Sequence, residues 1–149
     1  MPHEIATQTA KAVMPLPPTS AAAVDAVREL ERASQQMPQV ELVTEHAFWA
    51  GLYARTIMIP AGVCITGAQI KIPTMLIISG DVLVYGDGGP THLQGYCVTL
   101  GQAGRKQAFY AIADSWLTMV FATDAKDVET AEREFTDEYE SLGSHREGK

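Results

Sequence analysis

Residues 40–122 alternate between apolar and polar side chains in short runs, and this pattern limits the fold more than any other feature of the sequence. Turn residues, chiefly glycine, proline and aspartate, separate the runs. Short strands with turns about every 8–12 residues predict an all-β sandwich or barrel. No helix-length segment interrupts the series, which argues against a parallel α/β fold. The predicted strands are residues 52–59, 63–66, 68–72, 75–79, 82–85, 91–93, 96–100, 107–112 and 116–122.

A different pattern precedes the strands. Residues 1–18 have no steady period and contain four of the eight prolines, which predicts an extended arm. Ser20 then has the identity of a helix N-cap. We expect a helix over residues 19–37, ending before Pro38, and its thin apolar stripe indicates that it docks on another surface. The residues of this stripe are Val24, Val27 and Leu30.

The residues after the strands have helical spacing again. Their apolar positions recur at intervals of 3, 4, 4 and 3 residues, and Gly143 follows as a stop signal. We therefore expect one amphipathic helix over residues 123–142 and a tail over residues 143–149. Acidic side chains fill much of its other face, which is either solvated or turned towards a basic surface in an assembly. The apolar positions are Val128, Ala131, Phe135, Tyr139 and Leu142.

Charge is distributed unevenly along the chain. There are 18 acidic and 11 basic residues, a formal net charge of −7, which argues against a nucleic-acid binder. Residues 44–122 are only roughly 10% charged, where about 25% is ordinary. This shortage predicts either an uncharged surface rich in Ala, Thr and Gly or, as we favour, a surface partly covered in an oligomer or assembly. The charged residues of this segment are Glu45, Arg55, Lys71, Asp81, Asp87, Arg105, Lys106 and Asp114.

The sequence shows no signal for a membrane or for export. No stretch approaches about 18 consecutive apolar residues, so no transmembrane helix is expected. Three prolines at residues 15–18 interrupt the region where a secretory signal needs an apolar run, so we expect synthesis in the cytoplasm. Cys64 and Cys97 are too few for a disulfide framework. We expect both to be reduced and buried, although closeness across strands would also allow a bridge or a metal pair.

Some local motifs have both a catalytic and a structural interpretation. Asp114-Ser115 has no histidine placed by any motif to activate the serine, so a turn is favoured. Residues 87–90, Asp-Gly-Gly-Pro, look like a phosphate-binding loop but lack the lysine and helix that such a loop needs, which favours a hairpin turn. Arg105 and Lys106 form the only locally basic spot in the strand region. They are either solvated turn residues or contacts for an acidic partner surface.

Two stretches carry a resemblance to a known family. Residues 59–62 read Ile-Pro-Ala-Gly, and residues 110–118 read Tyr-Ala-Ile-Ala-Asp-Ser-Trp-Leu-Thr, followed by Ala-Thr at 122–123 and the acidic helix. Over residues 44–135 the chain resembles the small cupin-like proteins that tailed bacteriophages often encode. The resemblance implies a jelly-roll domain, which we place at residues 40–122.

The resemblance also implies where a metal would bind, and there the sequence departs from the family. Metal-binding cupins carry a His-x-His cluster on the strand after a glycine and a later histidine facing the same interior. Residues 68–75, after Gly67, contain no histidine, and Ile112 and Phe121 stand where the phage proteins tend to have one. We therefore expect a dry, packed barrel centre with no metal and no other cofactor. The histidines, expected to be surface or structural residues, are His3, His46, His92 and His145.

These observations leave three functions open. We favour a non-enzymatic structural protein, a phage capsid cement or decoration protein on the capsid exterior, which forms a homodimer or homotrimer and binds the major capsid protein. A cupin-type enzyme is disfavoured because no ligand set or acid–base pair is evident. The third is an intracellular binder of a small ligand or a host protein on a metal-free barrel, with a pocket lined by Gln69, Thr74, Tyr110 and Thr118.

The favoured function assigns the partner contacts to the arm, the two helices and the basic spot. No nucleic acid and no membrane is expected among the partners. The expected contact residues are Leu16, Val24, Val27, Leu30, Arg105, Lys106, Phe135, Tyr139 and Leu142.

Overall fold

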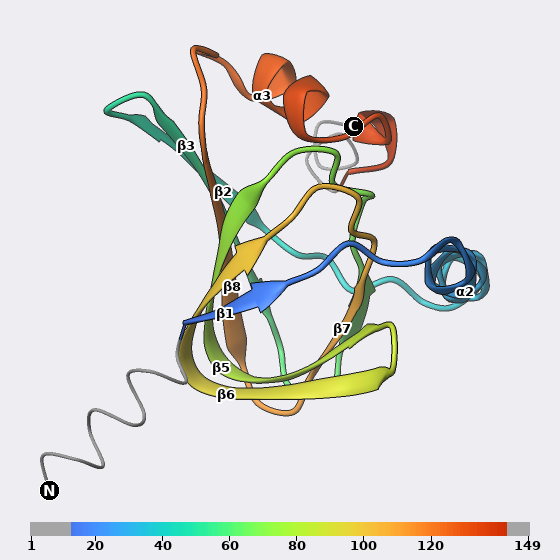
Figure 1. The fold of residues 1–149 in the computed structure, drawn as a ribbon. Helices are drawn as coiled ribbons and strands as arrows, with labels where there is room; N and C mark the ends of the chain where they lie inside the picture. Colours follow the sequence, from blue (N-terminus) through green and yellow to red (C-terminus); the bar gives the residue numbers. More distant parts are fainter. Residues whose placement is uncertain (1–12, 143–149) are drawn as a thin grey trace, which may run out of the picture.

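A computed structural model describes residues 13–142 and shows a jelly roll with one helix before its main strands and another after them (Figure 1). Hydrogen-bonded neighbours follow the order β1-β6-β5-β8-β3-β2, while β7 pairs with both β4 and β5. The all-β, cupin-like jelly-roll class expected from the sequence is confirmed. The strands are β1 (Val13–Leu16), β2 (Thr44–Trp49), β3 (Leu52–Ile59), β4 (Cys64–Thr66), β5 (Thr74–Gly86), β6 (Gly89–Gly101), β7 (Ala108–Ala111) and β8 (Ser115–Ala122). The helices are α2 (Ala21–Ser34), α3 (Val128–Phe135) and the 3₁₀ helix η1 (Tyr139–Ser141).

The long strand β5 bends the sheet into a barrel. Its residues 75–79 pair with β8 and its residues 82–85 pair with β7, so it belongs to both walls. The change of partner occurs at Gly80, whose φ is +148° and where a Cβ atom would clash with Ser115. Glycine is therefore required at this crossing. The Ser115 hydroxyl fixes it by accepting a hydrogen bond from the Asp81 N–H at 2.9 Å.

Some strand predictions need correction. Two continuous strands stand where four short ones were predicted. β5 covers the predicted strands 75–79 and 82–85, because it bends at Gly80 without breaking. β6 covers the predicted strands 91–93 and 96–100. Residues 68–72 do not form a strand. They make a loop with a single bridge between Ile70 and Arg105, and Pro73 follows directly.

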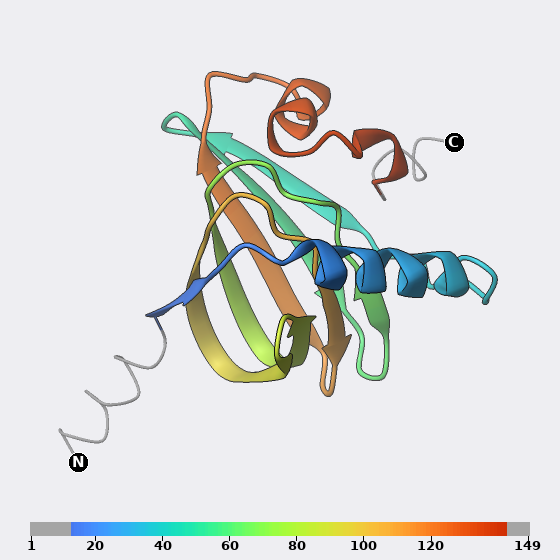
Figure 2. The ribbon, with the colours of Figure 1, turned by 45° about the vertical axis from the view of Figure 1, so that its right-hand side comes forward.

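Apolar side chains fill one end of the barrel, which we call the closed end. These residues come from β3, β5, β6 and β7 and are almost entirely shielded from solvent. The closed end comprises Ile59, Ile78, Val82, Val84, Leu93, Cys97 and Ala111. The opposite end of the barrel, which we call the open end, is covered by α2, the segment 37–42 and the region of α3 and η1, and it contains the cavity described below. Figure 2 shows α2 in front of the strands and α3 above their ends.

The segment before the main strands is held to the barrel along its length. β1 adds to β6 in parallel, and Leu16 is buried in the core. Ser20 is the N-cap of α2 as predicted, since its hydroxyl accepts from the Ala23 N–H at 3.1 Å. The Asp87 carboxylate in turn accepts from the Ser20 N–H and hydroxyl at 2.7 and 2.6 Å. The motif at 87–90 is thus a hairpin turn between β5 and β6 that anchors α2.

The helix predicted over residues 123–142 is shorter than expected. α3 ends at Phe135 because Thr136 is extended and the Phe135 carbonyl accepts from the Lys71 N–H at 2.8 Å instead of continuing the helix. The Thr136 hydroxyl then accepts from the Glu138 N–H at 3.0 Å. This break turns Glu138 towards the barrel, where it has a partner. Gly143, the predicted stop signal, lies outside the described residues.

Among residues 13–142, neither α-helix is long and apolar enough to cross a membrane.

Candidate ligand-binding site in the barrel

The open end of the barrel contains a cavity of about 590 Å³. Side chains from β3, β4, β5, β7 and β8 form its wall, and α2, the segment 37–42 and Phe135 form its rim. Most of the wall is aliphatic or aromatic. The apolar residues of the wall are Ile57, Val63, Ile65, Leu76, Phe109, Leu117 and Met119. The polar and charged residues that line the wall and the rim are Glu31, Ser34, Gln35, Gln39, Glu41, Thr44, Arg55, Thr66, Arg105, Gln107 and Ser141.

The cavity corrects the expectation of a packed, dry barrel centre. The closed end is packed, but residues 68–72 form a loop at the mouth instead of a strand whose side chains would fill the interior. Small residues at this point, Gly67 and Ala68, line the opening. The barrel is therefore filled at one end and hollow at the other.

Arg55 forms a buried ion pair beside the cavity. Its Nη1 donates to Glu132 Oε2 at 2.8 Å, and the side chains of Arg55 and Glu132 are 11% and 2% exposed. The guanidinium carbon lies 5.6 Å from the centre of the Phe135 ring, within the range of a cation–π contact. Tyr53 lies next to this pair, and burial, opposed by Arg55, raises the pKa of its hydroxyl. The pair attaches α3 to β3.

Lys106 is neither solvated nor on the surface, the two environments that the sequence left open for it. Its side chain is fully buried, and Nζ donates to Glu138 Oε1 at 2.7 Å, to the Gly67 carbonyl at 3.0 Å and to Glu31 Oε2 at 3.2 Å. Burial alone would raise the pKa of Glu138, but hydrogen bonds from Lys106, the Gln69 N–H and Arg28 outweigh it and hold that pKa below its usual range. Lys106 thus joins α2, the loop after β4 and the segment before η1.

Arg105 is buried beside Lys106 but has no carboxylate partner among residues 13–142. Its Nη2 donates to the Thr74 hydroxyl at 2.8 Å and its Nη1 to the Gln102 carbonyl. The guanidinium lies directly over Gly101, where a Cβ atom would occupy its place. The residue is 3% exposed, and burial lowers the pKa of Arg105 to about 10. It therefore remains cationic at neutral pH.

The sequence predicts that nine residues of this chain contact a partner. In the structure, most of them pack against other parts of this chain. Six are buried within the subunit, so a partner would reach them only by displacing α2, β1 or α3; these are Leu16, Val24, Val27, Arg105, Lys106 and Phe135. Leu30 is exposed, and Tyr139 and Leu142 are half-buried. Phe135, Leu142 and Arg105 line the cavity. Contact with a partner remains a prediction for these positions.

The pocket residues expected from the sequence do not line the cavity. Thr118 points to the outside of β8 and shares a hydrogen bond of 2.8 Å with Thr56. Thr74 instead holds Arg105, and Gln69 accepts from Arg28 at 2.9 Å. Tyr110 is also absent from the wall, which its neighbour Phe109 forms. On both β7 and β8, the residues expected to face the cavity face away from it, and their immediate neighbours in the sequence face it instead.

The interior does not fit a metal ion. The side chains around the cavity from β3 and β8 are aliphatic apart from the Met119 thioether and the paired Arg55. In the part of the chain that the structure describes, no group of three His, Cys, Asp or Glu side chains lies close enough to hold a metal. Ile112 is exposed after β7, and Phe121 packs against Phe135.

The described histidines and cysteines have other environments. His46 Nδ1 lies 2.7 Å from the Tyr53 hydroxyl and His92 Nε2 lies 2.5 Å from Asp81 Oδ1, while His3 and His145 lie outside the described residues. Both cysteines are free thiols. Cys97 is buried as expected, but Cys64 is exposed on β4 at the edge of the cavity, so burial was wrong for it.

The Asp114-Ser115 motif is a structural turn. Asp114 Oδ1 accepts from the Ala61 N–H at 2.9 Å, which ties this turn to the turn after β3. Ser115 Oγ accepts from the Asp81 N–H next to Gly80, as described above, and donates to the Ala113 carbonyl at 2.8 Å.

The outer face of the large sheet is almost uncharged. The strand registers place outward side chains in rows across β2, β3, β8, β5 and β6, and Glu45 is the one charged residue among those of this face. We call this surface the outer face. Its residues are Glu45, Ala47, Trp49, Leu52, Ala54, Thr56, Met58, Met75, Ile77, Ser79, Tyr96, Val98, Leu100, Trp116, Thr118, Val120 and Ala122.

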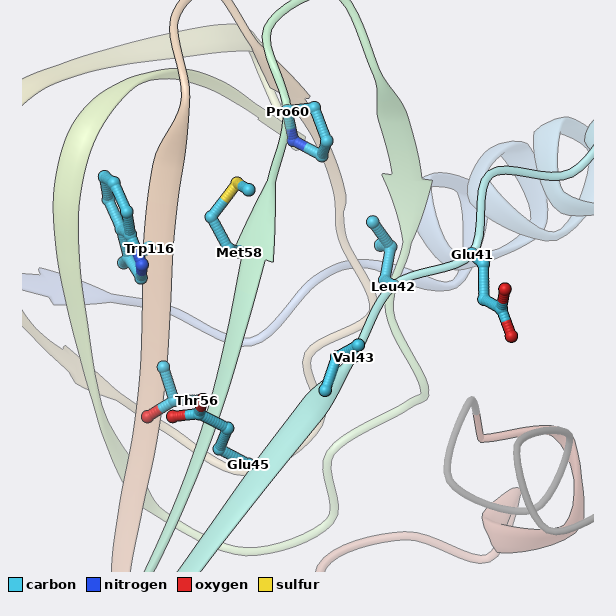
Figure 3. Close-up of a pocket in the computed structure, with 8 residues that line it drawn as sticks. All are labelled: Glu41, Leu42, Val43, Glu45, Thr56, Met58, Pro60 and Trp116. Carbon is cyan, nitrogen blue, oxygen red and sulfur yellow. The ribbon is translucent and has the colours of Figure 1, made fainter.

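A second, smaller hollow of about 220 Å³ lies at one edge of the outer face. Figure 3 shows Trp116, Met58 and Pro60 on one side of it, with Val43 and Leu42 from the segment before β2 on the other. Glu41 and Glu45 lie along the same edge.

No protein-family model matches the chain, and no curated protein matches it. Solved cupin structures are similar to it over part of its length. KdgF from Halomonas sp. is 14% identical over 62% of this chain and 89% of its own, with a TM-score of 0.48. The cupin domain of Schizosaccharomyces pombe Cnp3 is 19% identical over 70% and 74%, and a cupin superfamily protein from Desulfitobacterium hafniense is 12% identical over 61% and 87%, both with TM-scores of 0.46. These likenesses concern the fold alone.

Proposed function

We propose that this chain is a small-molecule binding protein that holds its ligand in the cavity at the open end of the barrel, without a resident metal. The observation that carries the proposal is the cavity itself. Its volume of about 590 Å³ is within the range of roughly 300–1,000 Å³ of ligand sites, and its wall is mostly apolar with a few fixed polar groups, as such sites are.

The polar groups around the cavity favour binding over catalysis. The Glu31 carboxylate is held by Lys106, and Glu132 beside the cavity is held by Arg55. A general acid or base needs a carboxyl group that is free to exchange a proton with a substrate. Both carboxylates are instead fixed as the partners of buried cations, so we assign them to structure; the third, Glu41, is exposed on the rim segment 37–42.

Thermal unfolding of the full chain with a panel of aromatic and aliphatic acids, alcohols, sugars and nucleotides tests the proposal. A ligand that binds only the folded state at about 100 times its Kd adds about 2.7 kcal/mol to the free energy of unfolding, so a bound class raises Tm visibly. Titration calorimetry then gives the Kd of each compound that raises Tm.

Two variants of β8 locate the binding site. Met119 points into the cavity, so Met119→Trp should abolish binding of the compounds found. Val120 is the next residue and points to the outer face, so Val120→Trp should leave their Kd unchanged. Unchanged binding by a folded Met119→Trp protein would place the ligand elsewhere and contradict the proposal, as would a panel in which no compound raises Tm.

A second candidate function, the capsid cement or decoration protein expected from the sequence, rests on a separate observation. The outer face has one charge, and seven of its large apolar or aromatic side chains are between 36% and 84% exposed. At about 150–250 Å² for a whole aromatic side chain, Trp49, Tyr96 and Trp116 alone expose roughly 400 Å², and the Leu and Met side chains of this face add to it. A stable interface buries about 800 Å² on each partner. The outer face of a second copy of this chain is the occupant we propose.

Light scattering of the purified chain tests self-association. The wild type should be a dimer or larger oligomer, and Trp116→Glu should make it monomeric. Leu30→Glu places the same charge at an exposed apolar position on α2, and this variant should have the same oligomeric mass as the wild type. A monomeric wild type would contradict the interface. For the capsid role, mass spectrometry of purified virions should find this chain in a simple ratio to the major capsid protein, and its absence would contradict that role.

A further inference from the structure

We propose that the ligand of the cavity is a monocarboxylate with an apolar body and that Arg105 is the residue that binds the carboxylate. The inference rests on the proposed binding function and adds the chemical class of the ligand. It depends on how the cations around the cavity are neutralised.

The open end buries three cationic side chains, and two of them have anionic partners. Arg55 is paired with Glu132, and Lys106 with Glu31 and Glu138. Arg105 has only the Thr74 hydroxyl and the Gln102 carbonyl, which are neutral, and no carboxylate within residues 13–142. A buried cation is normally paired, because its desolvation is otherwise uncompensated. The unpaired charge at a cavity wall indicates a site for an anion.

The guanidinium is held in place before any ligand binds. Its two hydrogen bonds and the flat surface of Gly101 beneath it fix its position. These bonds use two of its five N–H groups, and the other three have no partner in the described part of the chain. A planar guanidinium presents parallel N–H groups that fit both oxygens of a carboxylate. Because the side chain is already ordered, little conformational entropy is lost on binding.

The rest of the cavity determines what the carboxylate is attached to. Apolar side chains such as Ile57, Leu117 and Phe109 offer no hydrogen bonds and favour an aliphatic or aromatic body. Glu31 and Glu41 also line the cavity, and their charges would repel a second negative group on the ligand. Dicarboxylates and phosphate dianions should therefore bind less well than monocarboxylates.

Binding of a matched pair of compounds to the full chain tests the inference. The probes are 2-naphthylacetate and 2-(2-naphthyl)ethanol, which have the same apolar body and differ in the anionic group, measured by titration calorimetry at pH 7.5. A charge-assisted hydrogen-bonded pair should make the acid bind about tenfold more tightly than the alcohol, or better. Equal affinity would overturn the role of an anion and leave the cavity function standing. Binding of neither would overturn both.

Variants of Arg105 and its surroundings assign the effect to this residue. Arg105→Met should lower the affinity for the acid about tenfold and leave that for the alcohol unchanged. Arg32→Met, which removes a cation from an exposed position on α2, should change neither. If Arg105→Met does not fold, Gly101→Ala serves instead, because the added methyl group displaces the guanidinium while keeping its charge. Full preference for the acid in a folded Arg105→Met or Gly101→Ala protein would overturn the assignment.

Discussion

The two ends of the barrel are built from different interactions. At the closed end, Ile59, Ile78 and Val82 are fully buried in a cluster of apolar side chains. At the open end, ion pairs attach α3 to Arg55 on β3 and α2 to Lys106 before β7, and Lys106 also holds the loop after β4 by a hydrogen bond. One jelly roll thus has an apolar core at one end and a framework of charges around a cavity at the other.

The difference shows how the chain combines stability with a hollow interior. Apolar packing stabilises a fold by filling space, so it cannot keep a cavity open. Ion pairs and hydrogen bonds hold segments at defined positions without filling the volume between them. Stability from burial should therefore be concentrated at the closed end, and the open end should tolerate loss of cavity-lining atoms better than loss of its charged partners.

The largest effect is expected from a truncation at the closed end. Ile78→Ala removes fully buried methyl groups from a packed core and should lower the free energy of unfolding by about 4 kcal/mol. Ile77→Ala, one residue away and on the outer face, should cost about 1 kcal/mol or less. Urea unfolding of the two proteins measures both. A loss below about 1 kcal/mol for Ile78→Ala would show that this end is not packed as described.

At the open end, the largest effect is expected from the Arg55–Glu132 pair. Glu132→Ala leaves a buried guanidinium without its partner and should cost about 3 kcal/mol in urea unfolding. Glu129→Ala, on the exposed side of α3, should cost well under 1 kcal/mol. The double variant Arg55→Met with Glu132→Leu should recover much of the loss, because no charge is then buried. No recovery would mean that the pair's geometry, and not its charge balance, holds α3.

The sequence predicts the barrel better than it predicts the site. Short strands, the Ser20 cap and the turns at 59–62 and 87–90 depend on local patterns, and these features were found. The strand phase within the barrel was harder to determine. β8 carries Leu117 and Met119 inward but Thr118 and Val120 outward, so both faces are nearly uncharged and the usual contrast between inside and outside is missing.

The charged framework could not be predicted from local patterns at all. Lys106 pairs with Glu31 and Glu138, which lie 75 and 32 residues away in sequence, so no short motif records their contact. Arg55 did leave a signal, because it interrupts the inward series of Tyr53, Ile57 and Ile59 on β3. A charged residue at an inward strand position indicates a buried partner, and that partner is Glu132.

A smaller effect at the open end is expected in the pH dependence of stability. The pKa of Glu138 is held below its usual range by its hydrogen bonds, so the folded state favours the charged carboxylate. This contribution is complete above the ordinary glutamate pKa of 4.5 and is lost as the pH falls through the lowered value. Glu138→Gln should therefore reduce the loss of stability between pH 5 and pH 3 by less than about 1 kcal/mol. An identical pH profile for the variant and the wild type would show that Lys106 does not depend on this partner.

The smallest effect is expected in the chemistry of the two thiols, one at each end. Cys64 is exposed at the edge of the cavity and Cys97 is buried at the closed end. Burial raises the pKa of both thiols, so at pH 8 each has less thiolate than a free cysteine, and iodoacetamide should modify Cys64 a few-fold more slowly than it modifies glutathione. Cys97 should react only in urea, since its access requires unfolding. A ligand in the cavity should slow Cys64 further without changing Cys97 in urea, as mass spectrometry of the modified peptides would show. Modification of Cys97 at the rate of Cys64 in native protein would mean that the closed end opens as readily as the cavity, which the packed core does not allow.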